Sequence, residues 1–179
     1  MAQISTEVLG DERGTLLAFV EAQRTAIRES ILGLSEEQAA SRPSASELTL
    51  SGLLKHVAEV ELNWLRLAQQ APGGTSQAEP GGERQRTQET WGEAFRLVDG
   101  ESIPSVLAFW DEVAEQTAAF VAALPSLDAT FPLPPAPWFP KDAKVSMRWM
   151  LLHLVEEFAR HAGHADIVRE SLDGTKAMG

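Results

Sequence analysis

Hydrophobic residues recur every three or four positions in four stretches of the chain, which is the spacing of one face of an α-helix. These stretches cover residues 11–34, 49–69, 102–124 and 145–172. Their apolar faces are formed, in chain order, by Leu16, Val20, Ile27, Ile31 and Leu34, by Leu53, Val57, Val60, Trp64 and Leu67, by Leu107, Trp110, Val113, Thr117, Val121 and Leu124, and by Met150, Leu154 and Val168. No strand-like alternation and no internal repeat accompanies them. The pattern predicts an all-α fold, a four-helix bundle.

Two long connections separate the later helices. About thirty residues rich in Gly, Pro, Gln and charge join the second helix to the third, with Trp91 and Phe95 as their large apolar residues. The connection from the third helix to the fourth contains residues 131–140, which are too rich in proline for a helix or a central strand. We expect that segment to form an ordered flap over one end of the bundle. Ser35 and Gln38 form a capping box that predicts a short helical turn after the first helix.

Composition narrows the class of protein. A chain of 179 residues suits one domain over 1–179, and 15 basic against 26 acidic residues give a net charge of −11. That charge opposes the phosphate contacts of nucleic-acid binding and disfavours anionic membrane surfaces. With no cysteine, thiolate metal sites and disulfides are excluded. No signal peptide or apolar run of membrane-spanning length is present. We therefore expect a soluble cytoplasmic protein. A homodimer is compatible with the sequence, which does not decide the oligomeric state.

Three ionisable residues lie on the apolar face of the last helix. Glu157 and His161 fall about 20° to either side of the centre set by Met150 and Val168, and His164 about 40° away. A buried, isolated charge costs several kcal/mol, so these groups should pair with each other or share a cation. The spacing Glu157-x-x-x-His161 places both donors one turn apart, as in helical zinc motifs.

The second helix offers a third ligand. His56 lies about 60° from the centre of its stripe, still toward the interior, with Asn63 near the same edge. Two imidazoles and a carboxylate with open positions form the ligand set of catalytic zinc sites and also of iron, nickel or manganese sites. We predict zinc first and nickel second. The alternative is a metal-free core in which the histidines bond to each other and to Asn63.

A ferritin-like di-iron centre is not expected. That centre takes carboxylates from all four helices, and the last helix has no Glu-x-x-His. The acids of the third helix, Asp111, Glu112 and Glu115, all point about 100° or more from its apolar face.

Other candidates lie near the predicted centre. Arg24 falls within the stripe of the first helix and is either a core-paired arginine or an anchor for a substrate carboxylate. Trp64, Trp138 and Phe139 are candidates for an apolar pocket over the open side of the metal, with ordinary core packing as the alternative. His153, about 60° off its stripe, is expected at the edge of the core.

The sequence also resembles a known family. The order of His56, Glu157 and His161, with the segments Leu-Ser-Glu-Glu-Gln (34–38), Leu-Lys-His-Val-Ala-Glu-Val-Glu (54–61) and Glu-Phe-Ala-Arg-His-Ala-Gly-His-Ala-Asp (157–166), is similar to the DinB-like superfamily. The nearest branch is related to mycothiol-dependent maleylpyruvate isomerase, which has Glu at the position of Glu157 where many members have His. The resemblance covers essentially the whole chain.

The resemblance implies a four-helix bundle with a divalent metal, typically zinc or nickel, held by His56, Glu157 and His161. It also implies a low-molecular-weight thiol as partner and a thiol transferase or isomerase acting on a small molecule, with the metal lowering the thiol pKa. His164 lies beyond the three-ligand pattern and is a fourth ligand, a partner of a ligand, or a proton carrier. A closed shell of four ligands would favour a non-catalytic bundle in which the metal is structural or sensory.

Overall fold

The computed structural model describes residues 10–70, 91–134, 137 and 139–176. The elements are α1 (Glu12–Ile31), α2 (Glu36–Ala40), α3 (Leu50–Gln69), the 3-10 helix η1 (Trp91–Phe95), α4 (Ile103–Ala123), β1 (Thr130–Pro132), β2 (Lys144–Ser146) and α5 (Met147–Asp173). The four long helices pack together, which confirms the predicted fold class. Within the described part of the chain, no helix is both long and apolar enough to cross a membrane.

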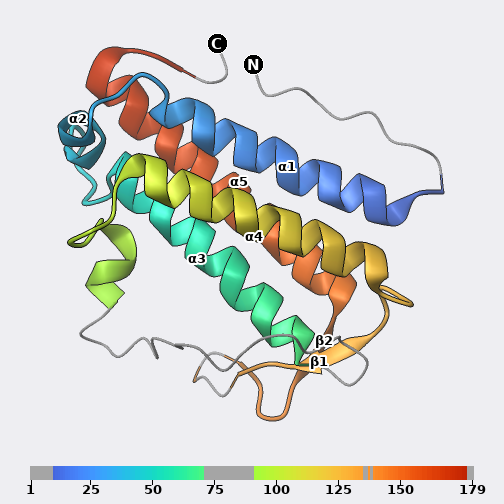
Figure 1. Cartoon of the computed structure of the whole chain (residues 1–179). Helices are drawn as coiled ribbons and strands as arrows, with labels where there is room; N and C mark the ends of the chain where they lie inside the picture. The colour runs from blue at the N-terminus through green and yellow to red at the C-terminus, as the bar shows by residue number, and fades with distance from the viewer. Residues whose placement is uncertain (1–9, 71–90, 135–136, 138, 177–179) are drawn as a thin grey trace.

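The direction of the helices explains the length of the connection between α3 and α4. In Figure 1, α1 and α5 run one way along the bundle, whereas α3 and α4 both run the other way. A helix of the length of α3 rises about 30 Å, at 1.5 Å per residue. The chain between two parallel neighbours must return over that distance, so a short turn cannot join α3 to α4.

Side-chain caps fix where the helices begin. At each N-terminus a hydroxyl or carboxylate accepts a hydrogen bond from a backbone N–H of the first turn. The capping residues are Asp11, Ser35, Thr49, Ser102 and Ser146. The capping box predicted at Ser35 is present, and a second one occurs at Ser102.

The buried face of α3 differs from the predicted one. Val60, Trp64 and Leu67 are half-buried, whereas Glu61 is fully buried. The periodicity of hydrophobic residues cannot place a carboxylate in the core, because a buried charge is tolerated only with a partner from elsewhere in the fold.

That partner is Arg24 on α1, whose side chain is 4 % exposed. Its Nε donates to Glu61 Oε2 at 3.0 Å, and its Nη2 pairs with Glu61 Oε1. Trp110 on α4 donates its indole N–H to Glu61 Oε2 at 2.9 Å, and Arg24 Nη1 also contacts Glu21 at 2.7 Å. Three helices therefore meet at one buried carboxylate. These contacts are those of the core-paired alternative for Arg24.

A small hairpin connects α4 to α5. β1 and β2 pair antiparallel, with Phe131 opposite Val145. No strand was expected here, because three-residue strands are too short to show alternation and Pro132 masks the signal. Phe131 is fully buried, so this part of the proline-rich connection closes one end of the core.

Candidate metal centre

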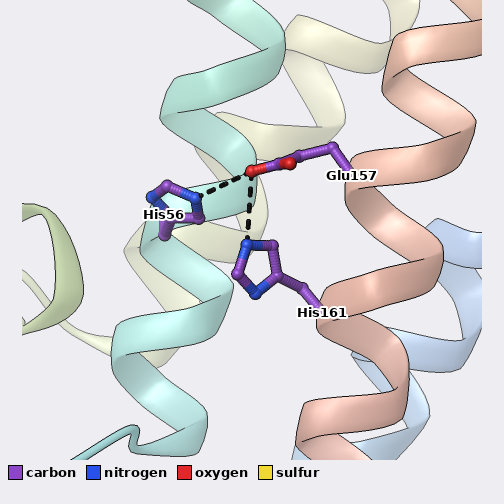
Figure 2. Close-up of side chains that lie close together, drawn as sticks. All are labelled: His56, Glu157 and His161. Carbon is purple, nitrogen blue, oxygen red and sulfur yellow. Dashed lines mark hydrogen bonds and ion pairs between the residues drawn. The ribbon is translucent and has the colours of Figure 1, made fainter.

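Three side chains from two helices converge between α3 and α5 (Figure 2). His56 comes from α3, and Glu157 and His161 come from successive turns of α5. One ligand atom from each lies within 4.8 Å of the other two, and among the described residues this is the group of His, Asp and Glu side chains that could hold a metal ion. The Nε2 atoms of both histidines lie 3.2 Å from Glu157 Oε1. The predicted ligands are thus brought together from positions a hundred residues apart in the sequence.

The cluster is shielded from solvent without being sealed. His56 and His161 are each 7 % exposed, and the side chain of Glu157 is 15 % exposed. Asn63 is exposed, so the metal-free alternative in which it joins the histidines is not the arrangement found. The carboxylates of Asp111, at 58 % exposure, and of its neighbours on α4 also face solvent, as predicted.

The carboxylate of Glu157 is held in its charged form. Hydrogen bonds from His161 and then from His56 keep the pKa of Glu157 well below its usual range, against the opposing effect of burial. Its second oxygen, Oε2, accepts a hydrogen bond from Arg160 Nη1 at 3.2 Å. A deprotonated carboxylate beside two imidazoles is ready to bind a cation.

His164 contacts the opposite edge of His161. The Nδ1 atoms of the two rings are 3.4 Å apart. Burial, and next the charge of His161, lower the pKa of His164, which favours the neutral ring. If Nε2 of His161 binds a metal, its Nδ1 carries the hydrogen and donates it to His164. His164 thus contacts the nitrogen of His161 that is not bonded to Glu157.

Phe95, the last residue of η1, covers one side of the cluster. Its ring stacks on His56 with centroids 4.1 Å apart and an interplanar angle of 19°, and lies 6.2 Å from the ring of His161. Gly52 makes this approach possible, since a Cβ there would lie 2.0 Å from the carbonyl oxygen of Phe95. Sequence analysis did not assign Phe95 to the site. A glycine one turn before His56 within a helix was the available signal, because it marks a close backbone approach.

An aromatic cluster lies on α5 one turn before Glu157, on the side of Glu157 opposite His161. His153 stacks on Trp149 at 5.0 Å, and the ring of Trp64 meets His153 edge-on at 4.8 Å and Trp149 at 5.4 Å. His153 is 24 % exposed, at the edge of the core as expected. The pocket candidate Trp64 therefore belongs to a cluster beside the metal ligands.

The other pocket candidates are less defined. Phe139 is half-buried in the connection between β1 and β2. Trp138 lies outside the described residues. Their place over the metal stays a prediction.

The donor set fits a divalent metal. Imidazole nitrogen and carboxylate oxygen suit zinc, nickel, iron and manganese, and three protein ligands leave coordination positions for another molecule. A helical bundle whose facing helices supply such donors has a possible metal site between them.

Comparison with known protein families identifies the family to which this chain belongs. The sequence model of the mycothiol-S-transferase family matches residues 15–174, so the chain belongs to this family. The resemblance to the DinB-like superfamily is thereby confirmed. A search of curated proteins found no match.

Proposed function

We propose that the protein is a metal-dependent mycothiol S-transferase, which joins the thiol of mycothiol to a small electrophile. The convergence of His56, Glu157 and His161 in a chain of this family carries the proposal. In the transfer, the thiol loses its proton, a sulfur–carbon bond forms, and the leaving group departs from the electrophile with the bonding electrons.

The three side chains would hold the metal through two Nε2 atoms and Glu157 Oε1. A divalent ion supplies this chemistry by lowering the pKa of a thiol that binds it, as it does for water. Zinc is the first choice for the donor set and nickel the second. His164 would keep His161 in the tautomer whose Nε2 is free to bind, and Arg160 would steady Glu157 from solvent.

The surroundings support a reaction on an organic substrate. Phe95 stacks on His56, and one turn before Glu157 on α5 His153 packs against the rings of Trp64 and Trp149. Such walls exclude water from a nucleophile and give an apolar electrophile a surface to bind.

The alternative, a non-catalytic bundle with a structural or sensory metal, predicts a closed set of four protein ligands. His164 is the residue that could close it. Its contact is with Nδ1 of His161, the nitrogen that points away from Glu157, rather than with the shared ligand atoms. This placement favours a metal with open positions and therefore favours the enzyme.

The test begins with metal content. Protein purified without a tag and reconstituted should contain about one equivalent of zinc or nickel by elemental analysis. The loaded protein is then incubated with mycothiol and a panel of electrophiles, and conjugates are identified by mass spectrometry. Glutathione serves as the thiol control.

We expect conjugate formation with mycothiol above the uncatalysed rate, and its loss in His161→Ala. Asn63→Ala is the matched control, because that side chain is exposed on the same helix as His56. Sub-stoichiometric metal that does not rise on reconstitution would contradict the metal site. Full metal with no mycothiol conjugate from any electrophile would favour the structural alternative.

A further inference from the structure

A cavity lies next to the candidate metal ligands. A cavity of about 550 Å³ lies between α2, the start of α3 and the segment from Phe95 to Ser102. Its volume is in the range of small-molecule sites, about 300–1,000 Å³. The ligands of the metal centre are not among the residues that line it.

Phe95 joins this cavity to the metal centre. Phe95 lines the cavity, and its ring stacks on His56 and lies 6.2 Å from the ring of His161. A molecule that fills the cavity and extends along the ring of Phe95 therefore arrives at the two imidazoles. The cavity is placed to hold the body of a ligand whose reactive end reaches the metal.

The polar groups of the wall define the chemistry of that body. Arg42 and Arg96 supply cations, whereas Glu36, Asp99 and Glu101 supply carboxylates. Glu101 is paired with Lys55 at 2.7 Å, so neither sign of charge prevails among the remaining groups. The remaining polar residues on the wall are mostly hydroxyl-bearing, namely Thr49, Ser51 and Ser102. Mixed donors and acceptors suit a neutral molecule with many hydroxyl groups, since a charged ligand would meet a like charge on one side.

Mycothiol has such a body. It links a cysteine thiol through an amide to a sugar and an inositol ring, which together present many hydroxyl groups and no charge. We propose that the cavity between α2 and residues 95–102 binds the sugar and inositol rings of mycothiol, with the thiol directed past Phe95 toward the metal. This inference rests on the proposed function, but it makes a separate claim about which residues select the thiol.

The test uses a probe that cannot bind through sulfur. N-acetylglucosaminyl-inositol has the sugar, the inositol ring and the amide of mycothiol but no thiol. It is titrated into isotope-labelled, metal-free protein, and binding is followed by the backbone amide signals in NMR, a measurement that also detects millimolar affinity. We expect the largest shifts at Leu97 to Glu101 and at Ala40 and Arg42.

Two tryptophan substitutions provide a matched pair. Ala40 is exposed at the end of α2 and lines the cavity, so Ala40→Trp fills space without disturbing the core. Ala45 is also exposed, five residues further along and outside the cavity wall. Ala40→Trp should weaken binding of the probe at least tenfold, whereas Ala45→Trp should leave it unchanged, and both should retain full metal content.

The outcomes separate this inference from the proposed function. If mycothiol forms conjugates but the thiol-free probe shifts no signals, or binds Ala40→Trp as well as the unchanged protein, the cavity does not hold the rings and the transferase stands. Probe shifts confined to the seam between α3 and α5 would place the rings elsewhere and overturn the inference. If the probe binds the cavity but no conjugate forms, the binding site stands and the transferase is contradicted.

Discussion

Replacing Arg24 with methionine tests whether the buried ion pair is structural. The substitution keeps much of the side-chain volume and removes the guanidinium. Glu61, which is fully buried, then retains Trp110 as its one donor among the contacts described above. The carboxylate must either stay charged in the core or take up a proton.

The expected loss follows from that burial. Removing one partner of a buried ion pair costs about 3–5 kcal/mol, because the remaining charge is left without compensation. For a protein of this length, 1 kcal/mol corresponds to about 2–4 °C in Tm, so the Tm should fall by about 6–20 °C.

Urea and thermal unfolding measure the effect, in chelator and again with saturating metal, because a bound metal adds its own stabilisation. Arg42→Met is the control. Arg42 lies 3.7 Å from Glu47 with its side chain 59 % exposed, and exposed pairs of this kind contribute at most about 1 kcal/mol. Adding Glu61→Gln to Arg24→Met removes the buried charge but keeps an acceptor for Trp110, so the double variant should be more stable than Arg24→Met.

The reasoning fails if Arg24→Met loses no more stability than Arg42→Met, or if the double variant is no more stable than Arg24→Met. A variant of normal stability whose KM rises for substrates with a carboxylate would instead support a substrate-anchoring role for Arg24.

Three further predictions concern the site and its frame. His161→Ala should abolish metal binding, whereas His164→Ala should keep one equivalent of metal at saturating concentration. Elemental analysis measures the metal content of both variants. Equal loss of metal in both would show that the centre has four ligands. Gly52→Ala should destabilise the protein despite the better helix propensity of alanine, because a Cβ meets the backbone of η1; greater stability with an unchanged NMR environment for the metal-ligand histidines would contradict this. The pKa of Asp173 is lowered to about 2 by its hydrogen bond with Arg169. The stabilisation of the folded state by this pair is therefore present above about pH 4 and is lost as the pH falls toward about 2. Carboxyl NMR measures the titration midpoint of Asp173, and a midpoint near the ordinary value of about 4 would refute the pairing.

The helices and the convergence of the three candidate ligands were predictable because their signals are local. Each long helix carries a period of three to four residues and a cap at its start, and both features depend on neighbours in the sequence. The ligands on α5 could be recognised because charged groups interrupt that period. Their convergence with His56 follows once two apolar faces must meet.

The rest depends on contacts across the fold. The burial of Glu61 requires Arg24, 37 residues away, and no local pattern announces that pairing. Phe95 lies in a connection without periodicity, so its contact with His56 becomes visible only when η1 is placed against Gly52. Short paired strands escape prediction for the same reason, since their stability comes from packing against the bundle.

Because α3 and α4 run parallel, a long connection joins them, and the candidate metal donors and part of the cavity wall lie on different kinds of segment. The metal donors sit on helices that build the core, where most substitutions are costly. The cavity wall beside them is formed in part by residues 95–102, and surface connections tolerate changes of length and sequence. If the proposed transferase activity holds, exchanging residues 91–102 for another segment with matching ends should change which thiol or electrophile is accepted, while His56, Glu157 and His161 stay in place.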